Sequence, residues 1–186
     1  MKPIMARLPY LNQEDLPEDQ RQLLQRPANL YRLLVHSPDA FRNFSRLGGW
    51  IRSGSTLDAR LREMAILQVG FMTDSAYEWT HHILLGRDFG VTDDDVRAIV
   101  TETQGGGSSL SQLDRLVLRA AREMTEDLKV SEEAFVGLKA HLSNEHLIDL
   151  LMTIAYYNLV VRVLHSLEVE LEPEYEQVLQ EFPLDV

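Results

Sequence analysis

Residues whose types and spacing suit acid–base chemistry gather in the segment TDSAYEWTHH, residues 73–82. On a helix that turns by about 100° per residue, Ser75, Glu78 and His82 lie within about 60° of one another. A carboxylate beside an imidazole orients the ring, favours its protonated form and lets the histidine exchange a proton near neutral pH. The segment therefore predicts an acid–base site built on Glu78 and His82.

A second carboxylate, Glu63, lies twelve residues before Ser75 on a preceding predicted helix. Residues 72–75 form a predicted turn that would fold the two helices together and bring Glu63 over the face that carries His82. His81 points about 100° away from His82 on the same helix. Helical geometry alone therefore does not place both histidines in one site.

The same residues also have a purely structural interpretation. Ser75 and Glu78 have the spacing of a capping box, in which the serine accepts from the third helical N–H and the glutamate reaches back to the serine N–H. Tyr77 and Trp79 are then core or interface aromatics, and the histidines are partly exposed. Glu78 and His82 could also bind zinc or iron, but no second histidine lies on that face. We expect neither a metal nor another cofactor.

The elements that must position these residues are predicted to be helices. Apolar residues recur in steps of three and four along most of the chain. The one strand-like alternation, at residues 167–175, is short and is interpreted as a helix exit or an extended tail. The pattern predicts long helices at 57–72, 75–89 and 144–167, with shorter helices between them and a glycine-rich loop at 103–109. We expect an all-α fold.

The chain is expected to form a single domain, because 186 residues suffice for one sizeable core and are few for two. Helix order and capping are similar on the two sides of the glycine-rich loop, which suggests an internal helical duplication. We divide the predicted domain into an N-terminal helical extension (1–55), a core (56–167) and an acidic C-terminal tail (168–186).

Composition excludes several classes of function. The chain has no cysteine, which excludes disulfides, thiolate zinc sites and thiol nucleophiles. The formal net charge of -11 repels nucleic acid and anionic membrane surfaces, and no run of lysine and arginine offsets it. The N-terminal residues lack the apolar stretch of a signal peptide, and the apolar runs are shorter than a membrane span. We expect a cytoplasmic protein with a small-molecule substrate and neither nucleic-acid nor membrane partners.

One long segment resembles a known family. Residues 57–99, LDARLREMAILQVGFMTDSAYEWTHHILLGRDFGVTDDDVRAI, are similar to the signature segment of the carboxymuconolactone decarboxylase family, within the alkyl hydroperoxidase D-like (AhpD-like) superfamily. The shared pattern is an early helix with Arg-Glu, a Tyr-Glu-Trp element, a histidine, and Gly-Val-Thr with an acidic cluster. The resemblance extends through residues 29–52 and 147–173. It implies an AhpD-like helical bundle that assembles as a homo-oligomer, either a dimer, a trimer or a hexamer.

The peroxidase branch of this family carries Cys-x-x-Cys-x-x-x-His and a glutamate twelve residues before the first cysteine. The resemblance places Ser75 and Glu78 at the two cysteine positions, His82 at the histidine and Glu63 at the proton-relay glutamate. Both thiols are absent, so cysteine-dependent peroxidase chemistry is excluded for this chain. The decarboxylase branch acts on a lactone acid with acidic and histidine side chains, without a metal or an organic cofactor.

Two functions are therefore predicted as alternatives. One is a cofactor-independent lyase for a small carboxylated or lactone substrate, with His82, Glu63 and Glu78 as its catalytic acid–base residues. The other is a non-catalytic oligomeric member of the family that kept the fold without the redox chemistry.

The substrate-binding residues of the lyase are expected around the acid–base set. We assign this role to Ser75, Trp79, Tyr156 and Arg162. Arg162 is preferred as the cation for an anionic substrate, whereas surface ion pairs are expected for Arg60 and Arg62. Tyr157 and Asn158, beside Tyr156, either line the pocket with it or belong to the core.

Overall fold

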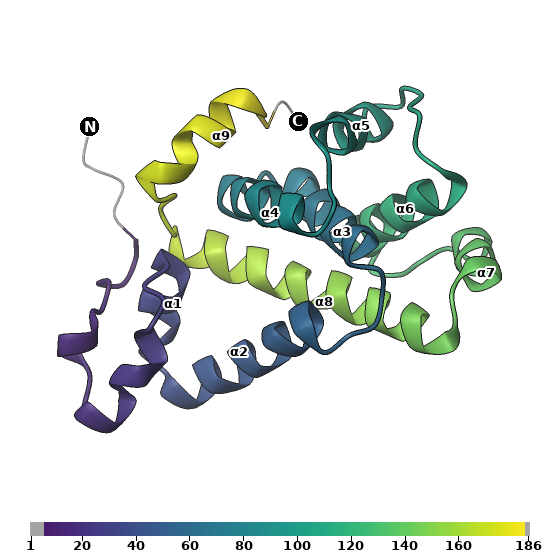
Figure 1. Cartoon of the computed structure of the whole chain (residues 1–186). Coiled ribbons are helices and arrows are strands. Elements are labelled where there is room, and N and C mark those ends of the chain that lie inside the picture. Colours follow the sequence, from purple (N-terminus) through teal and green to yellow (C-terminus); the bar gives the residue numbers. More distant parts are fainter. Residues whose placement is uncertain (1–5, 185–186) are drawn as a thin grey trace.

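The computed structural model describes residues 6–184, in which every regular element is a helix (Figure 1). The α-helices are α1 (Asn29–Leu34), α2 (Pro38–Ser53), α3 (Ala59–Met72), α4 (Ala76–Asp88), α5 (Asp93–Thr103), α6 (Gln112–Glu126), α7 (Glu132–His141), α8 (Asn144–Leu167) and α9 (Glu176–Glu181). Short 3-10 helices are η1 (Gln13–Asp15), η2 (Glu18–Leu24) and η3 (Pro173–Tyr175). The all-α prediction is confirmed.

The long predicted helices are observed with small shifts at their starts. The helix predicted at 144–167 has the bounds of α8. Those predicted at 57–72 and 75–89 begin slightly later, as α3 and α4, because Asp58 and Ser75 are N-cap residues whose side chains accept backbone N–H groups of the first turn. The predicted glycine-rich loop separates α5 from α6.

The central helix of the fold is α3, which packs against α4, α5, α6 and α8. Every residue from Leu61 to Phe71 is buried, so this stretch of α3 has no solvent-facing side. In Figure 1, α8 crosses the molecule between α2 on one side and the α3–α4 pair on the other, and it contacts both α2 and α3. Side chains of α3 that point toward α4 and α8 are therefore isolated from water.

Two clusters of buried apolar side chains lie on opposite sides of α3. The larger cluster joins α3 to α6 and α8 and includes Ala65, Val117 and Ile154. The smaller cluster joins α3 to α4 and α5 and includes Trp79 and Ile99. Because α3 and α4 are both held in packed cores, the side chains at their contact have little freedom to move.

The chain after α8, predicted as an acidic tail, folds back against α4 in its described part. It leaves α8 at Glu168, which adopts the left-handed conformation with φ 52 and ψ 49. The following α9 contacts α4, and Phe182 is only 5% exposed within the smaller cluster. Residues 168–184 are therefore a wall of the fold, while the last two residues of the predicted tail lie outside the described residues.

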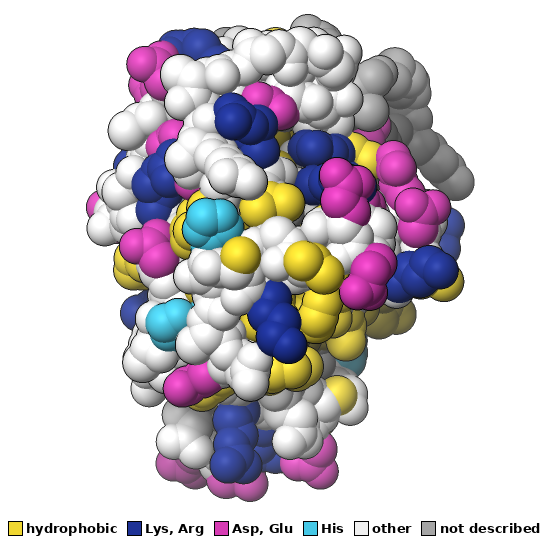
Figure 2. Space-filling view, turned by 90° about the vertical axis from the view of Figure 1, so that its right-hand side faces the viewer, with side chains coloured by type: hydrophobic (Ala, Val, Ile, Leu, Met, Phe, Trp, Pro, Cys, Tyr) yellow, Lys and Arg dark blue, Asp and Glu magenta, His cyan; other side chains and the backbone are white. Residues whose placement is uncertain are grey.

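In residues 6–184, α8 is the one helix whose length and composition would suffice to cross a membrane. This differs from the prediction that the apolar runs are too short, because the few polar residues of α8 leave its hydropathy high. Within the fold, 61% of its most apolar stretch is buried, as in the core helix of a globular protein. On the face shown in Figure 2, basic side chains are scattered among acidic ones and form no continuous patch.

Candidate active site

The turn between α3 and α4 determines where the predicted acid–base residues lie. Asp74 adopts φ 50, and the Ser75 N–H donates to the Gly70 carbonyl at 3.0 Å. The helices approach so closely at Gly70 that a Cβ there would lie 3.2 Å from the Trp79 backbone nitrogen. Ser75 Oγ then accepts from the Glu78 backbone N–H at 3.4 Å. This close crossing lets side chains of α3 reach those of α4.

His82, on α4, lies between two carboxylates. Its Nδ1 is 2.6 Å from Glu63 Oε2 of α3, and its Nε2 is 2.9 Å from Glu78 Oε1 one turn earlier on α4. All three side chains are buried. A ring nitrogen must carry a proton to donate to a carboxylate, so this arrangement suits an imidazolium that is protonated on both nitrogens.

The electrostatics of the cluster favour the same protonation state. Burial by itself lowers the pKa of His82, but the charges and hydrogen bonds of Glu63 and Glu78 outweigh it and raise the pKa from 6.5 to about 9. Burial by itself raises the pKa of Glu63, and the neighbouring His82 and Arg62 outweigh it and lower that pKa below 4.5. At neutral pH, His82 is therefore a cation with a proton to donate.

Arg62 completes the buried charge set behind His82. Its Nε donates to Glu63 Oε1 at 3.0 Å, and its guanidinium carbon lies 4.6 Å from the centroid of the Phe89 ring. Arg62 is only 2% exposed, so the surface ion pair predicted for it is wrong. Glu63 is shared between two cations, which holds it ionised and fixed in place.

The two carboxylates face opposite nitrogens of the imidazole ring, so their oxygens do not converge on one point beside it. Nowhere in residues 6–184 are three histidine, aspartate or glutamate side chains grouped closely enough to hold a metal ion. The donor geometry thus suits proton transfer, and the expected absence of a metal stays a prediction.

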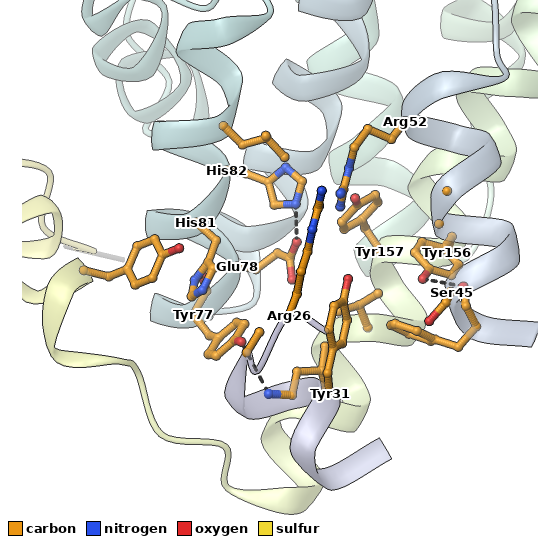
Figure 3. A pocket seen from close by; sticks show the side chains of 18 residues that line it. Arg26, Tyr31, Ser45, Arg52, Tyr77, Glu78, His81, His82, Tyr156 and Tyr157 are labelled. Carbon is orange, nitrogen blue, oxygen red and sulfur yellow. Dashed lines mark hydrogen bonds and ion pairs between the residues drawn. The ribbon is translucent and has the colours of Figure 1, made fainter. Parts of the chain in front are cut away.

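His82 and Glu78 line a cavity of about 380 Å³, shown in Figure 3. Its other walls come from the segment before α1, from α1, α2 and α8, and from η3 after α8. Ligand pockets in proteins commonly have volumes of about 300 to 1,000 Å³. The aromatic residues of its lining are Tyr31, Phe44, Tyr77, Tyr156, Tyr157 and Tyr175. The cavity thus has room for a small molecule between aromatic side chains.

Two arginines that the sequence analysis did not identify also line this cavity. Arg52 comes from the end of α2 and Arg26 from the segment before α1, and their side chains extend into the cavity in Figure 3. Burial by itself lowers the pKa of Arg52, but Tyr157 and Tyr31 outweigh it, and the pKa is raised. Both guanidinium groups face the same space as His82.

A helical spacing on α2 could have revealed this wall. Ser45, Gly48, Gly49 and Arg52 follow one another in steps of three, one and three residues, and all four line the cavity. Two glycines on one helical face, followed one turn later by an arginine, leave an open and positively charged surface. The sequence does not show that this face lies opposite His82, because the pairing of α2 with α4 is a tertiary feature.

The C-terminal segment closes another side of the cavity. His81 is stacked between the rings of Tyr77 and Tyr175, with centroids at 4.1 and 3.7 Å. Its Nε2 is 3.3 Å from Glu172 Oε2, and Glu172 Oε1 accepts from the Tyr77 hydroxyl at 3.0 Å. Both histidines of the opening motif therefore line one cavity, with separate partners, although their side chains diverge on α4.

The structure brings together only some of the predicted substrate-binding residues. Tyr156 lines the cavity and donates to the Phe44 carbonyl at 3.0 Å, and Tyr157 lines it beside the His82 ring. Ser75 does not line the cavity, because its hydroxyl caps α4. The capping box predicted with it is half formed, since the Glu78 carboxylate turns to His82.

Trp79 and Arg162 are not placed in the cavity, contrary to the prediction. Trp79 is fully buried in the smaller core cluster, and its indole N–H donates to the Phe182 carbonyl at 2.8 Å. Arg162 is exposed and bonds to Asn158, one turn earlier on α8. Asn158 itself is buried away from the cavity. The side chains of Trp79 and Arg162 both lie on faces of their helices that point away from the cavity.

Arg60 is partly buried rather than fully at the surface. Its guanidinium pairs with Asp95 at the start of α5 and with Asp114 at the start of α6. Both aspartates also cap their own helices, so Arg60 ties three helix starts together. It has a structural role in the fold and does not line the cavity.

Part of the chain matches a known family of sequences. The carboxymuconolactone decarboxylase family model matches residues 38–107, from the start of α2 to the loop after α5. This range includes Glu63, Glu78 and His82 together with Arg52. No curated protein matches the chain.

The chain is also similar to solved structures. One is the AhpD core of an uncharacterized peroxidase-related protein from Ralstonia eutropha JMP134, with a TM-score of 0.78, 22% identity, and coverage of 94% of this chain and 96% of that one. A second, from Silicibacter sp. TM1040, has a TM-score of 0.76, 18% identity, and coverage of 94% and 95%. A third is the debrominase Bmp8 in complex with 2,3,4-tribromopyrrole, with a TM-score of 0.78, 16% identity, and coverage of 96% and 100%.

At these identities the structural likeness shows a shared fold. The family match covers the helices that carry the histidine and both carboxylates. Residues 38–107 match the carboxymuconolactone decarboxylase family, and the chain has the AhpD-like fold and no cysteine.

Proposed function

We propose that the protein is a cofactor-independent lyase that acts on a small carboxylated or lactone substrate. The observation that carries this proposal is a buried histidine, held between two carboxylates, on the wall of a cavity that also presents two arginines. The histidine between its carboxylates is a proton donor, and the two arginines form a binding site for negative charge.

The proposed step uses the proton of His82. When a bond to carbon breaks and leaves its electron pair on a carbon conjugated with a carbonyl, that carbon takes the imidazolium proton. For a decarboxylation, the carboxylate leaves as carbon dioxide and the proton takes its place on carbon. His82 then regains a proton from solvent, because Glu63 and Glu78 favour its charged form.

The residues at the two cysteine positions of the peroxidase branch, Ser75 and Glu78, support the absence of thiol peroxidase activity. No cysteine is present to attack a peroxide. Ser75 is a helix cap and Glu78 is an ion-pair partner of His82, so the positions of the two thiols have other roles.

A turnover screen tests the proposal. The protein is incubated with a panel of lactone acids and other small ring carboxylates, and substrate loss and carbon dioxide release are followed. His82→Asn is expected to lower kcat by about 10²–10⁴-fold, the usual contribution of a positioned acid or base. His141→Asn, at an exposed position on α7, is the matched control and should leave kcat unchanged. Undiminished turnover by His82→Asn of every substrate used by the wild type would refute the role of His82.

A non-catalytic oligomeric module is the second candidate, and one observation favours it. Ile148, Met152 and Leu159 are exposed along α8, at 58%, 39% and 47%. An apolar face of this kind suits a contact with a second copy of the chain. Light scattering is expected to show a homo-oligomer that Ile148→Glu weakens. An oligomer that survives in His82→Asn, combined with no turnover by the wild type, would favour the module over the lyase.

A further inference from the structure

The arginine wall of the cavity contains polar groups that the protein itself leaves without partners. The Nε of Arg52 and the hydroxyl of Ser45 are both buried, and neither has a hydrogen-bond partner among the described residues. Both belong to the face of α2 that lines the cavity. Buried donors without partners are rare in folded proteins and call for an explanation. A ligand oxygen in the cavity would satisfy them.

The charges around the cavity point to the sign of that ligand. Neither Arg26 nor Arg52 forms an ion pair with any carboxylate in residues 6–184, although the whole chain carries a net charge of -11. By contrast, Arg62 and His82 are already neutralised by Glu63 and Glu78. Two guanidinium groups that reach the same space and have no carboxylate partner among the described residues therefore form a site for an anion.

The remaining walls point to the shape of the ligand. Tyr156 is in edge contact with Tyr157, with ring centroids 5.3 Å apart, and Phe44 packs on Tyr156 at 5.1 Å. Tyr31 and Tyr77 add further rings to the lining. Aromatic rings attract flat conjugated ligands through face and edge contacts. A flat ring fits this lining better than a flexible chain.

We propose that the cavity binds a small aromatic carboxylate, whose carboxylate group is held by Arg52 and Arg26 and whose ring lies among the tyrosines. This inference rests on the proposed function, since it assigns a ligand class to the same cavity. Two guanidinium groups stabilise a carboxylate and oppose its loss as carbon dioxide. The carboxylate that they hold is therefore an anchor, and the bond that breaks lies at the end of the ring nearest His82 and Glu78.

Binding of benzoate, measured by isothermal titration calorimetry on the intact protein, tests this assignment without any turnover. Benzamide has the same shape without the charge, and cyclohexanecarboxylate has the charge without the aromatic ring. Benzoate is expected to bind at least roughly tenfold more tightly than benzamide, because a hydrogen bond to a charged group is lost in benzamide. It should also bind more tightly than cyclohexanecarboxylate, because of the lost aromatic contacts.

Variants locate the anchor. Arg52→Gln and Arg26→Gln are each expected to weaken benzoate binding by roughly tenfold or more. Arg42→Gln removes the same charge from the exposed face of α2, outside the cavity, and should leave the affinity unchanged. Circular dichroism checks folding. Arg26 is exposed, so its variant remains informative if Arg52→Gln does not fold.

The outcomes separate the inference from the proposed function. Equal affinities for benzoate and benzamide, or unchanged benzoate affinity in both arginine variants, would overturn the anchor. Cyclohexanecarboxylate binding as tightly as benzoate would overturn the aromatic class. If benzoate binds as expected while no substrate in the turnover screen reacts, the inference holds and the lyase proposal fails. If turnover depends on His82 but neither arginine variant changes the affinity for benzoate, only the inference fails.

Discussion

The carboxylates on either side of His82 decide which half of an acid–base cycle the histidine can perform. A free histidine with a pKa near 6.5 is mostly neutral at pH 7 and serves as a base. With Glu63 on Nδ1 and Glu78 on Nε2, the pKa is raised to about 9 and the ring begins its cycle protonated. The proposed chemistry needs a proton donor, which is the state that this pairing favours.

Glu63→Gln tests this pairing at the scale of a single residue. The amide leaves Arg62 and His82 without their shared anion, and removing one partner of a buried pair costs about 3–5 kcal/mol of unfolding free energy. The pKa of His82 should fall, which shifts the alkaline limb of the activity profile to lower pH by about one unit or more. The pH–rate profile and a urea titration measure the two effects. Glu132→Gln, at an exposed position on α7, should change neither.

Much of the acid–base set could be predicted from the sequence because it depends on local geometry. The spacing of Glu78 and His82 on one helix, and the short turn after Met72, bring three side chains together without long-range information. Arg52 and Glu172 could not be predicted in this way. Each lies on an element distant in sequence, and no spacing reports which helices will pack together.

Among the helices, α2 carries two adjacent glycines, Gly48 and Gly49, on the face that lines the cavity. A Cβ built on Gly49 meets no atom within 4 Å, whereas one on Gly48 would lie 2.6 Å from the Tyr156 hydroxyl oxygen. The two adjacent glycines therefore have different reasons to lack a side chain. Gly48 makes room for the ring of Tyr156, and Gly49 leaves the cavity wide.

Gly49→Ala is expected to stabilise the fold and to weaken ligand binding at the same time. Alanine is favoured over glycine within a helix by about 0.5–1 kcal/mol, while its methyl group occupies part of the cavity. Thermal unfolding and benzoate affinity measure the two effects. Gly48→Ala is the matched control and should destabilise by about 1–3 kcal/mol, because Tyr156 must move. A fall in stability of Gly49→Ala would contradict the open space assigned to that position.

The two faces of α4 have separate tasks, which Trp79→Phe tests. The indole of Trp79 is fully buried on the face away from the cavity and donates to the Phe182 carbonyl. Its loss is expected to cost about 1–3 kcal/mol of stability. The KM and kcat of the folded fraction should remain those of the wild type. An increase in KM without a loss of stability would instead indicate that Trp79 contacts the substrate.

Helix phase explains why sequence analysis misplaced Trp79 and Arg162. The apolar pattern predicts both helices with bounds close to those observed, but a helix buried on several sides has no single polar face to orient it. On α4 and α8 the apolar residues surround the axis, so the pattern does not show which apolar residue faces the core and which faces a cavity.

At the scale of the whole molecule, buried charges are a source of pH-dependent stability. The raised pKa of His82 stabilises the folded state fully below about pH 6.5, and this contribution is lost as the pH rises through about 9. The lowered pKa of Glu63 stabilises the fold above about pH 4.5, and this contribution is lost as the pH falls below that value. The unfolding free energy should therefore be highest between about pH 4.5 and pH 6.5.

Urea titrations across this range check the prediction. The wild type is expected to lose stability between about pH 6.5 and pH 9, and His82→Asn should lose much less over the same interval. His141→Asn, whose histidine is exposed, should follow the wild type. A wild-type curve that stays flat through this interval would contradict a strongly raised pKa for His82.

The protonation state of His82 is the most direct test of the whole account, and nuclear magnetic resonance reads it without knowledge of the substrate. Ring nitrogen and carbon shifts of labelled histidine are followed as the pH is raised, with His82→Asn to assign the signal. His82 is expected to remain an imidazolium at pH 7 and to titrate at a pKa of about 9. A neutral His82 at pH 7, with a pKa at or below 6.5, would contradict its assignment as the proton donor.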